Sequence, residues 1–302
     1  MHKYFSRSNT LLIIASLIWG CAFVAQNVGM NYIGPWTFCS ARFLIAGISL
    51  ILIMPLLEKI QPKSHINNSA QANKELVISS LICGVALAIG SGIQQMAMVT
   101  VPVAKAGFLT TLYVLLVPVL SLFLGHRIKA KIWVGIVIAL VGLYLLSMAA
   151  SLTLGVGEVL LIGCALIFAI HIIVIGHYSV RVNPVKLSCG QFLVAGVITF
   201  FPAILIEKPV ISSVLAAYIP LLYTGIFSSS VAYTLQIFAQ KGASPTIAGM
   251  LLSLESVFAA IAGYLILHQT LTVRELIGCV LIFVAIVIAQ FPDRRDMVNV
   301  TQ

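Results

Sequence analysis

Two charged residues, Glu255 and Arg42, stand inside long apolar runs of this 302-residue sequence and are its first candidates for chemistry. At about 1.5 Å of rise per residue, Glu255 lies roughly 18 Å and Arg42 about 20 Å from the same membrane face. An unpaired charge at that depth should face a partner or a wet cavity. Glu255 can accept a proton or bind a cation, and Arg42 can bind an anion or act as counter-ion to Glu255. The alternatives are a structural Arg42–Glu255 pair, or an Arg42 that snorkels outward to lipid headgroups.

Aromatic residues and one histidine in other apolar runs are further candidates. Tyr113, Trp19 and Phe168 fall near mid-depth, so that together with Glu255 they can line one central cavity. Simple packing is the competing interpretation for each aromatic residue. His171 can relay protons near neutral pH, or it can be a satisfied buried histidine.

Three glutamines lie close to the ends of apolar runs. Gln94 and Gln236 can hydrogen-bond a substrate or take part in a gate, and they sit at opposite membrane faces. Gln95 is better explained as an interfacial amide. Pro118 predicts a kink in its helix, which is either a gate or a static bend.

The elements that position these residues are membrane helices. Residues of the set AVILMFWYC make up 61% of the chain and only 8% are charged, with a mean hydropathy of +1.11. A soluble domain carries roughly a quarter charged residues. Runs of about twenty apolar residues recur and can each cross the hydrocarbon core. We therefore expect ten spans, at 10–30, 35–57, 76–99, 103–124, 132–150, 158–178, 185–206, 214–239, 244–267 and 272–291. The stretch from Glu58 to Glu75 is expected to be the one substantial loop.

The distribution of basic residues predicts the orientation. With a cytoplasmic N-terminus, 13 of the 17 Lys and Arg fall in inner segments. Lys105, Lys208 and Arg274 fall in outer segments, and Arg42 lies within a span. This bias indicates an even number of spans with both termini in the cytoplasm. The net charge of +9 therefore orients the chain in a membrane, and we expect no nucleic-acid binding.

The two halves of the sequence resemble each other. At an offset of 149, Phe43, Leu44, Ala46 and Gly47 match Phe192, Leu193, Ala195 and Gly196. At an offset of 142, Gln94, Ala97, Gly107 and Leu112 match Gln236, Ala239, Gly249 and Leu254, and Tyr113 takes the place of Glu255. This order predicts a five-helix repeat over 1–150 and a second over 151–302. An odd number of spans per repeat inverts the second repeat, which is the plan of many secondary transporters.

With these motifs in place, the chain resembles the EamA family of the drug/metabolite transporter superfamily over nearly its whole length. The resemblance is carried by Trp19-Gly20 and Phe23-Val24, by Ala41 to Gly47, by Ala104 to Gly107, and by Ala248 to Glu255. Family members usually have a Glu where this chain has His126 and His268, and a proline where it has Ser256. The resemblance implies export or exchange of small metabolites such as amino acids or related compounds.

The predicted function is therefore secondary transport by alternating access at a midplane site between inverted repeats. The phosphate-loop, GxSxG, HExxH and Asp-rich patterns are missing from the sequence, so we predict no catalytic residue, cofactor, metal or enzyme activity. A membrane-embedded enzyme and a channel or scaffold stay as alternatives. We expect a metabolite and the lipid bilayer as partners, a proton as candidate coupling ion, and a monomer or homodimer in the inner (plasma) membrane.

Overall fold

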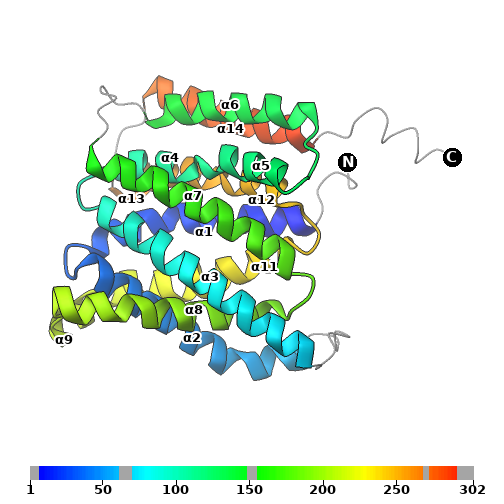
Figure 1. Ribbon diagram of the computed structural model, residues 1–302. Coiled ribbons are helices and arrows are strands. Elements are labelled where there is room, and N and C mark those ends of the chain that lie inside the picture. Colours follow the sequence, from blue (N-terminus) through cyan, green and yellow to red (C-terminus); the bar gives the residue numbers. More distant parts are fainter. Residues whose placement is uncertain (1–6, 61–69, 148–154, 268–271, 291–302) are drawn as a thin grey trace.

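The computed structural model describes residues 7–60, 70–147, 155–267 and 272–290, and the regular structure in these ranges is helical. The helices lie roughly along one common direction (Figure 1). In chain order they are α1 (Arg7–Gly29), α2 (Pro35–Ile60), α3 (Ala70–Ala97), α4 (Val103–Thr111), α5 (Tyr113–Phe123), α6 (Ala130–Ser147), α7 (Val156–Tyr178), α8 (Pro184–Pro202), η1 (Ala203–Glu207), α9 (Ile211–Ala216), α10 (Tyr218–Leu222), η2 (Tyr223–Tyr233), α11 (Thr234–Ala239), α12 (Pro245–Leu252), α13 (Leu254–Leu267) and α14 (Val273–Gln290). Segments η1 and η2 are π-helical.

The apolar runs of the sequence coincide with these helices to within a few residues at most ends. The loop predicted from Glu58 to Glu75 is too long, because α2 continues to Ile60 and α3 already begins at Ala70. Residues 61–69 lie outside the described ranges. So do His268 and the predicted boundary at residue 150.

The composition of the helices identifies a multi-pass membrane protein. In the described part, eight helical segments are long and apolar enough to cross a bilayer. Helices α6 and α14 are shorter, at 18 residues each. Large aliphatic and aromatic side chains face outward, among them Leu52, Leu205 and Phe283. Such an exposed apolar surface is expected where the solvent is lipid.

Two of the predicted spans are interrupted near their middle. Leu112 separates α4 from α5, and Ser253 separates α12 from α13. At both residues the ψ angle is close to zero, −12° at Leu112 and −15° at Ser253. The carbonyl of each residue accepts a hydrogen bond from the backbone N–H three residues later. Each interruption is thus a short 3₁₀ turn. Pro118 lies within α5, six residues after the interruption at Leu112, and the kink expected at Pro118 stays a prediction.

Helix α1 occupies the centre of the bundle. It packs against α12 and α13 and against η2 and α11, while α7 packs against α4 and α5 and against α3. Helices α2 and α8 form one pair at one edge, and α6 and α14 form another at the opposite edge (Figure 1). The second pair approaches closely, because a Cβ on Gly142 would lie 2.8 Å from the carbonyl oxygen of Gly278. Small residues permit this backbone contact in a membrane, where packing drives helix association.

The α2–α8 pair is fastened at one end by Glu207, the last residue of η1. Its carboxylate accepts hydrogen bonds from the backbone N–H of Trp36 (2.9 Å) and of Thr37 (2.8 Å), and from the Thr37 hydroxyl (2.6 Å). These two N–H groups belong to the first turn of α2, where Gly34 offers no capping side chain. Glu207 therefore supplies from another helix the anionic cap that the positive end of α2 requires.

Candidate functional site

A cavity of about 50 Å³ lies inside the bundle, between α1, α2, α3, α4, α5, α7, η2, α11 and α13. That volume has room for about three or four water molecules. The eight residues proposed from the sequence for substrate or ion binding all line this one cavity. Glu255, Tyr113, Trp19 and Arg42 form part of its wall. Gln94, Gln236, Phe168 and His171 form another part.

Glu255 and Tyr113 are joined directly. The Tyr113 hydroxyl donates to Glu255 Oε1 at 2.9 Å, and the Thr111 hydroxyl approaches the same oxygen at 3.4 Å. Both residues come directly after a helix interruption, since Tyr113 is the first residue of α5 and Glu255 is the second residue of α13. Back-bonding hydroxyls accompany the second interruption, where Ser253 bonds the carbonyl of Met250 (2.7 Å). Serine bonds of this kind bend helices.

Arg42 is buried, at 5% exposure, which excludes the alternative in which it snorkels to the headgroups. Its Nη1 donates to Gln26 Oε1 at 3.0 Å, and the guanidinium lies 4.7 Å from the centre of the Phe43 ring. Among the described residues Arg42 has no ion pair with Glu255. The alternative of a direct structural pair between Arg42 and Glu255 is therefore wrong, because each of the two charged groups makes its own polar contacts.

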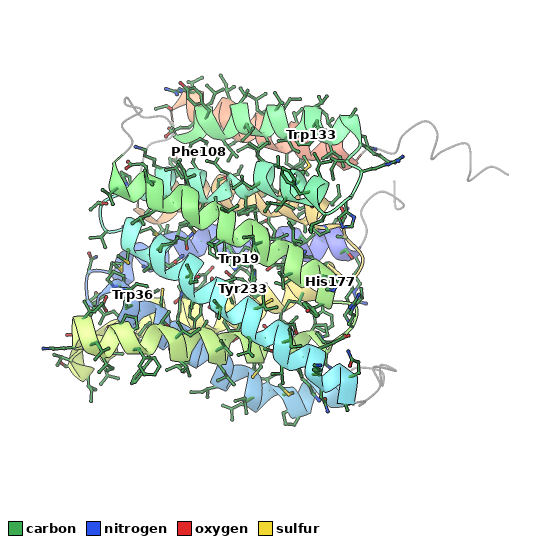
Figure 2. All side chains as sticks on the ribbon, in the orientation of Figure 1. Trp19, Trp36, Phe108, Trp133, His177 and Tyr233 are labelled. Atoms are coloured by element: carbon green, nitrogen blue, oxygen red, sulfur yellow. The ribbon has the colours of Figure 1, made fainter. Side chains whose placement is uncertain are left out.

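Trp19 and Tyr233 form an aromatic contact beside the cavity. Their ring centroids are 4.6 Å apart, and both side chains lie near the centre of the molecule (Figure 2). The indole Nε1 donates to the carbonyl of Ser228 at 2.9 Å. Ser228 belongs to η2, and a π-helical register changes which carbonyl groups remain open to side chains.

His171 and two of the glutamines make polar contacts that fix their side chains. His171 Nε2 is 3.0 Å from Gln191 Oε1. Gln94 donates to the Thr110 hydroxyl at 3.1 Å, and Gln236 donates to Gln240 Oε1 at 3.0 Å. Within the described part of the chain, Gln236 Oε1 has no hydrogen-bond partner. Each of these residues is buried and carries hydrogen-bonding atoms into an otherwise apolar interior.

The interfacial interpretation of Gln95 was wrong. Gln95 is completely buried and donates to the carbonyl of Gln26 at 3.5 Å. Its position near the end of α3 suggested an interface, but its side chain turns inward to α1. Gln95 is not among the residues that line the cavity.

Half of the cavity lining was missed in the sequence. The polar residues among those missed that the sequence could have indicated are Gln26, Tyr233 and Ser91. Gln26 is a polar residue within an apolar run, a signal that was present. Ser91 and Tyr233 match each other at the offset of 142, and comparing lining residues across the repeat would have found both. The remaining members are packing or hydroxyl residues without a distinctive signal.

The described residues contain no group of three or more His, Cys, Asp and Glu side chains that could hold a metal ion. Within the same ranges the six cysteines are free, and four of them are buried. The charged and imidazole side chains in the cavity lining are those of Arg42, Glu255 and His171. This set can bind an ion or an ionic group and can exchange a proton.

The sequence and the fold were compared with known proteins. The model of the EamA-like transporter family matches residues 6–148 and 155–290. An "Uncharacterized transporter" of Archaeoglobus fulgidus is 29% identical over 279 residues, which cover 92% of this chain and 83% of that protein. The "Uncharacterized inner membrane transporter YedA" of Escherichia coli K12 is 26% identical, covering 90% of this chain and 87% of that protein.

Two further similarities have the same extent. The "WAT1-related protein At3g02690, chloroplastic" of Arabidopsis thaliana is 25% identical over 95% of this chain and 70% of its own length. A crystal structure with 18% sequence identity has the same fold, with a TM-score of 0.76 over 93% of this chain and 96% of that one. With nearly all of its length matched, this multi-pass membrane protein belongs to the EamA-like transporter family.

Proposed function

We propose that this protein is a secondary transporter that moves small metabolites, such as amino acids or related compounds, by alternating access at the central cavity. In this proposal it has ten spans, as two inverted five-helix repeats over 1–150 and 151–302, with α6 and α14 as the fifth and tenth spans. Both termini are cytoplasmic, and the protein acts as an exporter or exchanger in the inner membrane.

The observation that carries the proposal is the bond between Tyr113 and Glu255. These residues occupy equivalent places in the two halves of the sequence, and they touch at 2.9 Å. Two equivalent residues can meet only near the axis that relates the halves. A twofold axis in the membrane plane, passing through a polar cavity, is the arrangement in which secondary transporters hold their substrate.

The rest of the cavity supports the same symmetry. Its walls contain further pairs at the offsets of 149 and 142, namely Trp19 with Phe168, Ala22 with His171, Phe23 with Ile172, Ser91 with Tyr233, and Gln94 with Gln236. The helix contacts are paired in the same way. The packing of α1 on α12 and α13 repeats in that of α7 on α4 and α5, and α2–α8 and α6–α14 each pair a helix with its own equivalent.

The size of the cavity supports a moving mechanism. A cavity of about 50 Å³ is small for an amino acid, and in this proposal the helices around it move apart when a substrate binds. The 3₁₀ interruptions at Leu112 and Ser253 are suited to such movement, because discontinuous helices carry the binding sites of many transporters. Glu255 is the acidic group of the cavity and is assigned the coupling proton.

Transport into liposomes tests the proposal. The purified protein is reconstituted and screened with labelled amino acids, with and without a pH gradient. We expect saturable uptake of at least one of them that the gradient accelerates, compared with protein-free liposomes. Uptake that is absent for the whole panel, from protein shown to be folded, would reject the proposed substrate class.

A further inference from the structure

Arg42 is a buried cation that forms no ion pair with a described residue. Among the described residues that line the cavity, Arg42 and Glu255 are the charged ones, and Glu255 is engaged by Tyr113 and Thr111. No described carboxylate forms an ion pair with Arg42. The compensation that Arg42 receives comes from neutral groups: the Gln26 amide oxygen, the Cys39 sulfur and the rings of Phe43 and Phe38. Neutral groups compensate a buried guanidinium only in part, since removing a charge from water costs several kcal/mol.

One edge of the buried guanidinium has hydrogen-bonding capacity left over. Nη1 is used by Gln26, whereas Nη2 makes only a weak contact of 3.8 Å with the Cys39 sulfur. Nε is buried and has no hydrogen-bond partner among the described residues. Nε and Nη2 form one side of the planar group, the side that binds a carboxylate through two parallel hydrogen bonds. The unused donors are therefore arranged for a planar two-oxygen acceptor.

A comparison of the two halves of the sequence distinguishes ligand binding by Arg42 from a purely structural role in holding helices together. The equivalent of Arg42 in the second half is Gln191, and the neighbouring Phe43 and Phe192 stack at 5.8 Å. The anchoring contact is thus kept in both halves, but the positive charge occurs in one. Gln191 is neutral and contacts His171. A charge that the packing of the equivalent helix does not require needs another explanation.

We propose that Arg42 binds the carboxylate of the transported molecule, so that the site selects substrates with a singly charged anionic group. This inference rests on the proposed transport function and specifies its substrate. Within the described lining Arg42 is the single Lys or Arg, which matches one carboxylate better than a doubly charged phosphate. The cavity of about 50 Å³ suits a group of that size.

The test is an equilibrium measurement with acetate and its neutral isostere acetamide. Trp36 and Trp133 are replaced by Phe, which leaves Trp19 of the cavity as the fluorescent reporter. We expect sodium acetate to change the Trp19 emission saturably, and acetamide and sodium chloride to leave it unchanged. Because a charge-assisted bidentate contact contributes about 1.5–3 kcal/mol, Arg42→Gln should weaken the acetate response by about tenfold or more.

The matched control is Arg181→Gln, which removes one positive charge from an exposed residue paired with Glu75 at 3.9 Å. It should respond to acetate like the parent protein. Equal responses to acetate and acetamide, a lack of response to acetate, or an Arg42→Gln variant that binds acetate normally would each overturn the proposal. The acetate–acetamide contrast is measured on protein with Arg42 intact, so it stands even if Arg42→Gln fails to fold.

Glycine distinguishes an amino acid from a simple carboxylic acid as the source of this group. It adds an ammonium group to the acetate skeleton, which Glu255 can bind. If glycine binds more tightly than acetate and loses that advantage in Glu255→Gln, the substrate is an amino acid. If acetate binds more tightly, the substrate is a monocarboxylate. Binding is measured without transport, so failure of the liposome screen leaves this result independent.

Discussion

Glu255 makes its side-chain hydrogen bonds with residues from the other half of the chain. Its carboxylate accepts from Tyr113 and approaches Thr111, and it is 5% exposed. A carboxylate held by hydroxyl donors can take up a proton without losing its neighbours, because hydroxyl groups can both donate and accept. This geometry suits a group that alternates between charged and neutral forms during transport.

We predict that Glu255→Gln abolishes pH-gradient-driven uptake while the protein still folds. Glutamine keeps the shape and an acceptor for Tyr113, but it cannot carry a proton. Since Glu255 has no ion pair among the described residues, its loss leaves no partner charge unpaired. Uptake into liposomes should fall to the level of protein-free liposomes, with a thermal midpoint close to that of the parent.

The matched control for this variant is Glu275→Gln, which changes a half-buried carboxylate outside the cavity that bonds Thr272 at the start of α14. Its gradient-driven uptake should be unchanged. Parent-like uptake with the same pH profile in Glu255→Gln would exclude the coupling role.

The site residues could be predicted because charged, amide and aromatic residues within apolar runs are few. Their partners could not, because Tyr233 and Gln191 depend on which helices meet.

At the scale of the elements, the ends of helices hold neighbouring helices together. Glu207 receives three hydrogen bonds from the first turn of α2. We predict that Glu207→Ala lowers stability by about 1 kcal/mol, the usual effect of losing a helix cap. For a chain of this size the thermal midpoint should fall by roughly 2–4 °C. Glu75→Ala, which removes an acid from a 3.9 Å surface pair, is the control and should have a smaller effect. Equal midpoints for both variants would contradict the capping role.

The α6–α14 contact gives a second prediction. A Cβ on Gly142 would meet the Gly278 carbonyl oxygen at 2.8 Å and the Ile282 backbone nitrogen at 3.0 Å. Gly142→Ile should therefore push the helices apart and lower the thermal midpoint in detergent. The control is Val141→Ile, one position away on the exposed face of α6. If the two variants melt together, the close contact does not stabilise the pair.

The helices were easier to predict than their interruptions. A run of apolar residues forms a helix in lipid because its backbone groups have no other partner. The position of a break depends on side chains that compete for backbone carbonyls. Such side chains stand at both breaks: Ser253 and Ser256 bond carbonyl groups in α12–α13, and Thr111, next to Leu112, bonds the carbonyl of Gly107 at 2.6 Å. Hydroxyl residues also occur in uninterrupted helices, so they do not by themselves predict where a helix breaks. The π-helical segment η2 contains hydroxyl residues of the same kind, since Ser230 bonds the carbonyl of Gly225 and Thr224 that of Pro220.

At the scale of the whole molecule, the distribution of Lys and Arg predicts its orientation. Reporter fusions after residue 302 and after Lys63 should indicate the cytoplasm, and a fusion after Gly155 the opposite side. A bias of 13 to 3 toward one face is the physical reason. Fusions that place the C-terminus opposite the N-terminus would contradict the inverted five-plus-five arrangement.

The central claim is that the cavity opens to the two sides of the membrane in turn, and one cysteine can test it. Ser91 lines the cavity and is 1% exposed, so Ser91→Cys in a chain without its six native cysteines changes little. Ser79, twelve residues earlier on α3, is completely buried and outside the cavity lining, and Ser79→Cys is the control. A membrane-impermeant thiol reagent is added to one side of oriented vesicles at a time. Alternating access predicts that Cys at position 91 reacts from either side while Cys at position 79 stays unlabelled. Labelling at position 91 from one side only, or from neither, would contradict the claim.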